Sequence, residues 1–502
     1  MVDLEYLRKS PLEKFWFNFK NFFKRIPAFL AAFFKAIPKK LYKLWLAFAG
    51  IFINIGKAAK EGDGWTRASF LVMGVGLIRR KQYLKGIMYL VFEVLFVLYM
   101  VFFGWKYLAK MGSLGEVERA EVWDDAVGDF VYNEFDNSLL ILLYSLLTLF
   151  IMSGFVYMWY QNVKGNLLSQ QFVEAKIPLP TSKDELHSYA NENYHKTLLA
   201  IPMLGLVLFT ILPIFFMVFI AFTNYDQFHM PPAKLFSWTG MENFQIVLGG
   251  GLSSNSKVFA YTFKEVLLWT IVWAVFATVT NYVLGMIVAI LINKKGVKCK
   301  KLWRTILVMT IAIPQFVSLM FMSQLLAEQG LINNILLKWG WIEKAIPFLT
   351  HDVLAKVMII VVNIWIGIPY SMLICTGILM NIPEDLYESA RIDGAGPFRA
   401  YMKITLPYML HVTMPYLITQ FIGNLNNFNV IYLLTGAVPE HMDMHFANKT
   451  DLLITWLYKL TLSGKQYGYA SVIGIFTFIV VAVFSLVLYN RSKSVKIEEE
   501  FM

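Results

Sequence analysis

Long apolar runs, separated by short charged stretches, dominate this chain. A helix needs about 20 mostly apolar residues to cross a membrane, and about eight runs reach that length before a charge cluster or a Pro/Gly turn ends them. The predicted spans are 86–108, 138–160, 198–222, 266–292, 306–326, 353–380, 411–435 and 469–489. These runs lack strand-like alternation, and backbone groups in lipid must be paired, so a β-barrel is excluded. The expected fold is all-α, a polytopic transmembrane helical bundle.

Composition and charge agree with a membrane protein. The chain is 57% hydrophobic and 16% charged, which is more apolar surface than a soluble core of this size can bury. The net charge of +11 invites a nucleic-acid interpretation, but the cations are concentrated between spans, at Lys294, Lys295, Lys298, Lys300, Lys301 and Arg304. Because Lys and Arg are retained on the cytoplasmic side, we expect this loop and both termini to be cytoplasmic in a bacterial plasma membrane, with no nucleic-acid partner.

The predicted domains follow from these patterns. Residues 1–65 form a basic, aromatic-rich arm, interrupted by Pro27 and Pro38, which is expected to lie at the inner leaflet and bind anionic lipid. A ninth span at 41–56 is the competing interpretation of part of this arm. Residues 66–197 carry two accessory spans and their loops, 198–490 the core of the bundle, and 491–502 a cytoplasmic tail.

A motif between the sixth and seventh spans, at 383–407, carries the functional information. Pro383 is expected to open a short helix, with Glu384 and Asp385 favourable in its first turn and Gly394 and Gly396 closing it. This loop resembles the EAA signature of ABC-importer permeases, whose positions fall on Glu388, Ser389, Ala390, Gly394, Ile404, Leu406 and Pro407. Ser389 is the one departure, Ser for Ala. An ordinary cytoplasmic loop with a chance glycine pattern is the alternative.

The resemblance implies a type I ABC importer permease fold and a division of labour. The short helix would dock in a cytoplasmic ATPase subunit, and Glu388 and Arg391 would pair with charges of that partner. The chain has no Gly-x-x-x-x-Gly-Lys-Ser/Thr motif, since its Gly-Lys pairs at Gly56 and Gly464 are followed by Ala and Gln. We therefore expect ATP and Mg to bind in the partner, no cofactor or metal in this chain, and no enzymatic activity of its own.

Three further stretches indicate which group of ABC-importer permeases the chain resembles. Residues 362–370, 424–436 and 449–458 are similar to the larger permease subunit of the MalF-type maltose/maltodextrin family, and 64–86 resembles its Gram-positive members. The resemblance implies import of a maltodextrin-type oligosaccharide. It also implies a second homologous, MalG-like permease, two copies of the ATPase and an extracellular sugar-binding protein.

Polar faces on two predicted spans are candidates for a sugar site. Gln420, Asn424 and Asn427 recur at i, i+4 and i+7 on the seventh span, and amides at mid-membrane usually face a cavity or another helix. The family's sugar contacts fall on Asn363, Ile366, Gly367, Tyr370, Gln420, Gly423, Asn424 and Asn427. Gln420 and Gly423 depart from the family's residue types. The alternative role for the amides is to join helices. Pro369 with Gly367 are candidates to break the sixth helix, and Pro314 the fifth.

Other sequence features give weaker indications of function. Glu93 lies inside the first span, where we expect it to pair with a neighbour or be protonated. His441, Asp443 and His445 have a spacing that suits a metal, but no third strong ligand or supporting shell is evident, so no metal is predicted. Two other function classes stay open: an ion-coupled secondary transporter acting alone, and a membrane-bound sugar-processing enzyme, for which the chain offers no convincing carboxylate pair.

Overall fold

The computed structural model describes residues 46, 49–126, 128–251, 254–294, 296–436, 438 and 440–491. Most of the predicted basic arm and residues 492–502 of the predicted tail lie outside these ranges. The described chain is helical apart from its loops and one small hairpin, which confirms the all-α prediction. It divides into two compact units, residues 1–115 with 137–216 and residues 116–136 with 217–502.

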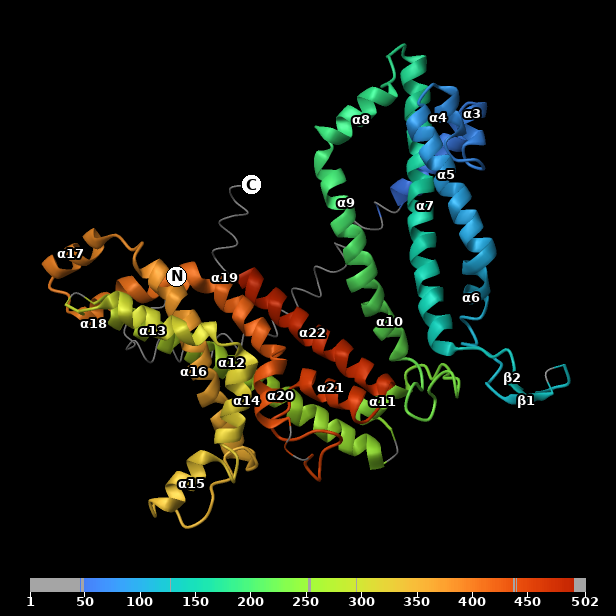
Figure 1. Cartoon of the computed structure of the whole chain (residues 1–502). Helices are drawn as coiled ribbons and strands as arrows, with labels where there is room; N and C mark the ends of the chain where they lie inside the picture. Colours follow the sequence, from blue (N-terminus) through green and yellow to red (C-terminus); the bar gives the residue numbers. More distant parts are fainter. Residues whose placement is uncertain are drawn as a thin grey trace. The chain divides into compact units, whose positions relative to one another are not determined.

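The first unit is built from three long helical segments and several shorter helices, and residues 49–61 are also helical (Figure 1). Its elements are α3 (Gly64–Ala68), α4 (Val75–Arg79), α5 (Tyr83–Tyr99), the π-helical turn η1 (Met100–Gly104), α6 (Trp105–Ala109), α7 (Ser138–Glu174), α8 (Ser182–Ala190), α9 (Tyr194–Leu206), the π-helical turn η2 (Val207–Ile211) and α10 (Leu212–Ile220), in which the boundary with the second unit falls.

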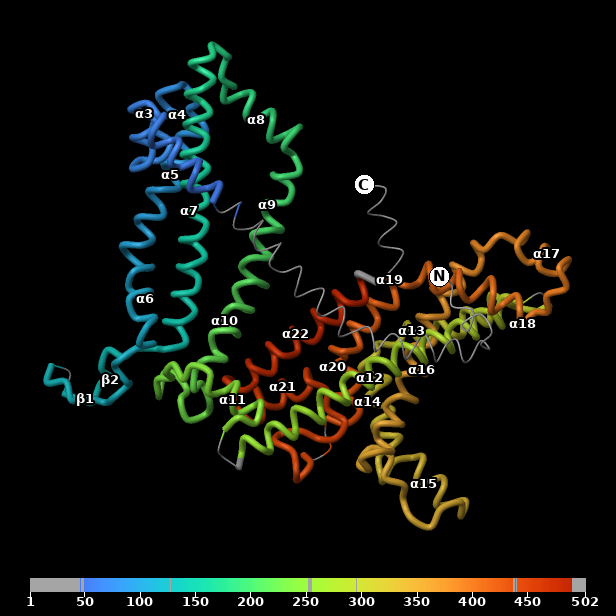
Figure 2. Tube along the Cα trace, turned by 180° about the vertical axis from the view of Figure 1, so that it is seen from behind, coloured from blue at the N-terminus to red at the C-terminus, as the bar shows by residue number. Residues whose placement is uncertain are grey.

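Antiparallel packing of α5–η1–α6 against α7 organises the first unit. Phe96 stacks on Phe155 with ring centroids 3.8 Å apart, and the hydroxyls of Tyr99 and Thr148 are 2.9 Å apart. Asn137 begins α7 by accepting the N–H of Leu139 at 3.1 Å, as an N-cap residue does. In both overall views α3 and α4 lie beside α7 near the start of α5 (Figures 1 and 2).

The second unit contains the rest of the bundle. Its elements are β1 (Glu121–Asp124), β2 (Asp129–Tyr132), α11 (Glu242–Leu248), α12 (Ser254–Asn293), α13 (Lys300–Ala312), α14 (Gln315–Leu325), α15 (Leu331–Lys338), α16 (Asp352–Leu379), α17 (Glu384–Ile392), α18 (Pro397–Ala400), the π-helical turn η3 (Tyr401–Thr405), α19 (Leu406–Leu425), α20 (Phe428–Thr435), α21 (Leu453–Leu462) and α22 (Tyr467–Arg491). The strands form an antiparallel hairpin, with Trp123 opposite Phe130, in a loop that the sequence analysis left without structure.

Six helices in the described ranges are long and apolar enough to cross a membrane, and the bent pair α13–α14 makes a seventh. They are Tyr83–Ala109, Ser138–Glu174, Tyr194–Ile220, Asn255–Asn293, Asp352–Leu379 and Tyr467–Tyr489. These bounds confirm the predicted spans in the same places, although α7 and α12 extend well beyond them. The eighth predicted span, 411–435, is not among these candidates, because it is divided between α19 and α20.

Close packing of α12 on α16 forms the centre of the second unit. A Cβ at Gly285 would overlap the side chain of Ser371 and lie 2.9 Å from the backbone nitrogen of Met372, so only glycine allows this approach. Further along α12, Trp273 is fully buried in a cluster with Ile359 and Val362 of α16, and its indole N–H donates to the carbonyl of Asn424 at 3.1 Å. Buried indoles usually find such a partner, and here the bond fixes the end of α19 against α12.

The two proline predictions have different outcomes. Ile313 is extended, with φ −81° and ψ 124°, and α13 and α14 meet at 86° across Ile313 and Pro314, so the predicted break in the fifth span is confirmed. The predicted break at Pro369 is wrong, because α16 runs through Pro369 to Leu379. On either side of that proline, Gly367 and Ser371 pack closely against α12.

Candidate functional site

The helix α17 has the local structure that its sequence predicts. Glu384 and Asp385 occupy its first turn and Arg391 its last, each sign opposite to the partial charge of that helix end. Gly394 has φ +72°. The N–H of Ala395 donates to the carbonyl of Ala390 at 2.8 Å, and that of Gly394 to Arg391 at 3.0 Å. This pair of bonds is a Schellman motif, which ends the helix with its last carbonyls satisfied.

The predicted coupling residues of α17 face outward. Glu388, Ser389 and Arg391 are exposed, and Ala390 is partly buried. Two large apolar side chains that the sequence analysis missed lie in the same loop: Ile392 is 87% and Phe398 74% exposed. Their position as apolar residues within a polar loop could have identified them, because exposed apolar patches mark interaction sites.

The other end of the motif is anchored in the bundle. The hydroxyls of Tyr387 and Thr405 are 2.8 Å apart, which joins α17 to the turn before α19. Leu406 packs against the core cluster that contains Met286, Met372 and Met409. Ile404 is partly buried and Pro407 is exposed in the first turn of α19. The motif therefore combines an exposed short helix with a fixed connection to a long one.

A cavity of about 770 Å³ lies beside α17. It is lined by Ile290, Asn293 and Lys294 of α12, by Leu379 and Ile382, by Glu384, Tyr387 and Arg391, and by Ala395, Pro397, Ala400, Tyr401 and Thr405. The ends of α12 and α16 thus meet the loop of the motif around one space.

The structure divides the predicted sugar residues of α16 into two groups. Ile366 and half-exposed Tyr370 line a small cleft with Gln315, at the break between α13 and α14. Gly367 faces α12 instead, since a Cβ there would overlap Asn281. Asn363 is buried, and its Nδ2 finds no hydrogen-bond partner among the described residues.

The predicted residues of the seventh span also separate. Gln420 and Gly423 are exposed on α19. Asn424 Nδ2 donates to Thr278 Oγ1 at 3.0 Å, and Asn427 Nδ2 donates to Asn424 Oδ1 at 3.2 Å. The prediction of one continuous helical face is wrong, because α19 ends at Leu425 and Asn427 accepts the N–H of Val430 as the N-cap of α20. The Asn427 amide oxygen takes a backbone N–H that a continuous helix would bond to a carbonyl. The helix therefore ends before Asn427, and the three residues do not share one helical face.

The remaining signals have local partners. Glu93 accepts a hydrogen bond from the N–H of Met73 at 2.7 Å, as expected of a carboxyl group that pairs with a neighbour. His441 lies 3.7 Å from both Asp352 and Asp443, whereas His445 Nε2 is 2.8 Å from Gln466 Oε1. These contacts draw the two histidines to different partners, and no group of three metal-binding side chains is found in the described ranges.

The fold and the site define a multi-pass helical membrane protein with a surface helix, α17, between the long helices α16 and α19. Residues 281–494 match the family of the binding-protein-dependent transport system inner membrane component. The galactooligosaccharides transport system permease protein GanP of Bacillus subtilis is 32% identical over 429 residues, covering 85% of this chain and 97% of that protein. The maltodextrin transport system permease protein MalC of Streptococcus pneumoniae is 31% identical over 438 residues, covering 86% and 96%.

A third relative matches a shorter part of the chain. The maltose/maltodextrin transport system permease protein MalF of Klebsiella aerogenes is 35% identical over 230 residues, covering 45% of this chain and 44% of that protein. With these relatives, the chain belongs to the binding-protein-dependent inner-membrane permeases of ABC importers, in their carbohydrate, MalF-type group. The expected family is therefore confirmed.

Proposed function

We propose that this permease subunit forms half of the pore that imports a maltodextrin-type oligosaccharide, and that a separate ATPase drives it by gripping α17. The observation that carries the proposal is the construction of the motif. Exposed α17 ends in a rigid cap and is joined through Tyr387 and Thr405 to the start of α19. A force applied to such a helix is transmitted to the long helices rather than absorbed by the loop.

The proposal includes the partners that such a machine requires. They are a second, homologous MalG-like permease, two copies of a cytoplasmic ATPase that holds ATP and Mg, and an extracellular sugar-binding protein. The family that matches residues 281–494 is described as a binding-protein-dependent transport system component, which supports the binding protein. The cationic loop 292–305 supports a cytoplasmic position for α17 and for both termini. Anionic lipid at the N-terminal arm is part of the same proposal.

The proposed substrate is an oligosaccharide, with a maltodextrin as the first candidate. The names of two relatives point to maltodextrin and to galactooligosaccharides. Tyr370 supplies an exposed aromatic ring beside Gln315, and Gln420 supplies an exposed amide. A ring face and planar amides are the groups that bind the C–H face and the hydroxyls of a sugar. Competition between labelled maltotriose and a β-galactooligosaccharide for uptake would rank the two sugars.

Replacement of Gly394 tests the coupling. At φ +72° a residue with a side chain costs about 1–2 kcal/mol, and valine, being β-branched, is at the unfavourable end. We expect Gly394→Val to leave ATP hydrolysis in the reconstituted complex but to abolish most sugar uptake. Gly396→Ala is the matched control, because Gly396 has φ −69° and open space at its Cβ position. Normal uptake by Gly394→Val, or uptake without any ATPase, would contradict the proposal.

A further inference from the structure

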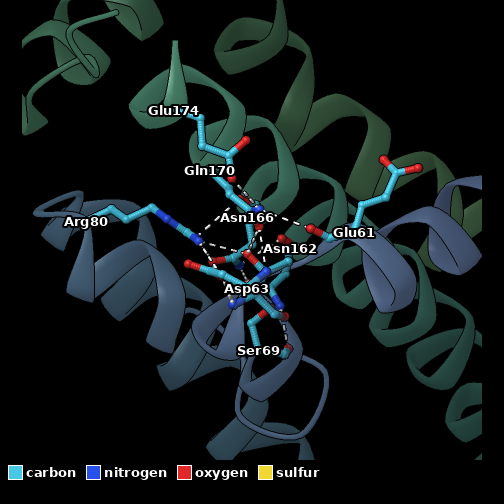
Figure 3. Close-up of polar contacts among 9 residues, drawn as sticks. Glu61, Asp63, Ser69, Arg80, Asn162, Asn166, Gln170 and Glu174 are labelled. Atoms are coloured by element: carbon cyan, nitrogen blue, oxygen red, sulfur yellow. Dashed lines mark hydrogen bonds and ion pairs between the residues drawn. The ribbon is translucent and has the colours of Figure 1, made fainter. Parts of the chain in front are cut away.

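One face of α7 holds the helix pair α3–α4 through four side chains, Gln170, Asn166, Asn162 and Trp159. At the charged end, Gln170 Oε1 accepts the N–H of Asp63 at 2.8 Å, and Arg80 donates to Asn166 Oδ1 at 3.2 Å (Figure 3). Further along, Asn162 Nδ2 donates to the carbonyl of Ser69, and Trp159 Nε1 to that of Phe70, both at 2.9 Å. At 1.5 Å per residue, the pair extends about 16 Å along α7 toward its apolar part.

The packing of α5 on α7 gives the depth that the tip of this pair, residues 70–74, reaches. Because Phe96 stacks on Phe155 in antiparallel helices, Glu93 and Trp159 lie at the same level. Both contact the tip, Glu93 through the N–H of Met73 and Trp159 through the carbonyl of Phe70. Counted from the nearest lysines, Lys85 and Lys164, the backbone at Glu93 and Trp159 lies about 8–12 Å along the two spans, whereas Gly86, which Gly74 contacts, lies next to Lys85. One leaflet's hydrocarbon is about 15 Å thick.

The backbone of the tip is satisfied without water. The N–H groups of Phe70, Leu71 and Val72 donate to carbonyls of the preceding turn at 3.0–3.1 Å. Those of Met73 and Gly74 donate to the side chains of Glu93 and Asn162 at 2.7 and 2.9 Å. Five consecutive N–H groups thus have protein partners. Non-helical backbone needs such partners in hydrocarbon, whereas in water it can bond to solvent.

The side chains of the tip match the same environment. From Ala68 to Ile78 the sequence has no charged residue, and the hydroxyl of Ser69 donates to the carbonyl of Thr66 at 2.6 Å. Leu71 is 84% exposed at the tip. Cations flank this stretch at Arg67, Arg79, Lys81 and Lys85, where phosphate headgroups would lie. Gly74, with φ +80°, brings the tip against α5, because a Cβ there would overlap the carbonyl of Gly86.

From this geometry we propose that α3–α4 is a re-entrant helical hairpin, whose tip inserts into the acyl chains of one leaflet and returns to the same face. Its partner is the lipid hydrocarbon, rather than another protein domain. Only the choice of the cytoplasmic leaflet rests on the orientation given under the proposed function. The insertion itself is inferred from the exposed apolar tip, its satisfied backbone and its contacts with α5 and α7.

Spin-label depth measurements test the insertion. The full chain, co-expressed with its partner subunits, would carry Cys299→Ser and Cys375→Ala and one added cysteine, at Leu71→Cys or Val72→Cys, in lipid nanodiscs. The lipid-facing control is Leu95→Cys, 59% exposed on α5, and the aqueous control is Leu186→Cys, 57% exposed on the polar helix α8. We expect labels at 71 and 72 to be relaxed by oxygen and protected from nickel-EDDA, as at 95. Nickel accessibility equal to that at 186 would overturn the proposal.

A pair of substitutions tests the hydrogen bond between Glu93 and the N–H of Met73, which tethers the tip to α5. Glu93→Gln keeps an oxygen for the N–H of Met73, whereas Glu93→Leu leaves that group unpaired. The label at 71 should stay protected in the first variant and gain nickel accessibility in the second. Equal accessibility in both would contradict the tether. An impermeant maleimide should label Leu186→Cys in inside-out vesicles only. Labelling from the opposite face would overturn the assigned leaflet and the proposed orientation, but not the insertion.

Discussion

His445 lies in the segment between α20 and α21, with its ring centroid 4.1 Å from that of Phe259 and its Nε2 2.8 Å from Gln466 Oε1. Burial lowers the pKa of His445 below the usual 6.5, although the hydrogen bond that its ring donates to Gln466 Oε1 opposes the shift. The folded protein therefore binds this proton less readily than the unfolded chain. The stability that neutral His445 contributes is complete above pH 6.5 and is lost as the pH falls below it.

The first prediction follows at this residue. Thermal unfolding in detergent should show a smaller loss of stability between pH 7.5 and pH 5.5 in His445→Gln than in the unchanged protein, because glutamine does not titrate. The comparison cancels the contribution of the other histidines. An identical pH dependence in both proteins would show that protonation of His445 does not matter.

A buried ion pair gives the second residue-scale prediction. Lys459 Nζ donates to Asp451 Oδ2 at 2.8 Å, with side chains 8% and 2% exposed. Lys459→Met leaves a buried carboxylate without its cation, which costs about 3–5 kcal/mol. The double variant Lys459→Met/Asp451→Leu should recover much of that loss, and exposed Lys465→Met should change little. Unfolding temperatures give the order of stability of the three variants. A Lys459→Met protein as stable as the unchanged one would refute the prediction.

At the scale of elements, the contact between α12 and α16 decides how the second unit is built. Gly285→Ala should destabilise the protein by about 1–3 kcal/mol, because the added methyl group meets the backbone of α16. Gly377→Ala, on α16 with open space at its Cβ position, is the matched control and should be neutral or slightly stabilising. Unfolding temperatures of the purified proteins measure both. Equal values would mean that the two helices separate at little cost.

Several elements follow from residue patterns, and others do not. The apolar lengths predicted most spans because lipid fixes the length of a crossing helix. The bounds of α17 followed from Pro383, Glu384 and Gly394 because caps act within one turn. Pro369 and Pro314 looked alike in sequence, yet only Pro314 breaks its helix. The difference lies in packing against α12, which local sequence does not record.

At the scale of the whole molecule, the exposed apolar residues of the coupling loop predict how the complex holds together. If Ile392 is buried against the ATPase, Ile392→Asp should weaken ATPase binding by about 2 kcal/mol or more, the loss typical of a central interface residue. Met442→Asp, at a fully exposed residue of the loop before α21, is the control and should leave the ATPase bound. Size-exclusion chromatography of the tagged complex gives the result. Retention of the ATPase by Ile392→Asp would place the interface elsewhere.

The sequence by itself determined that the chain crosses a membrane several times as helices, which loop is cationic, and where the coupling helix begins and ends. It did so because hydrocarbon thickness, charge placement and helix caps act on neighbouring residues. Tertiary structure decided which candidate site residues meet. It joined Asn424 to Asn427 at a helix break, turned Gly367 toward Asn281 and folded α3–α4 along α7. Those outcomes depend on contacts between residues far apart in the chain, whose packing and hydrogen bonds outweigh local preference.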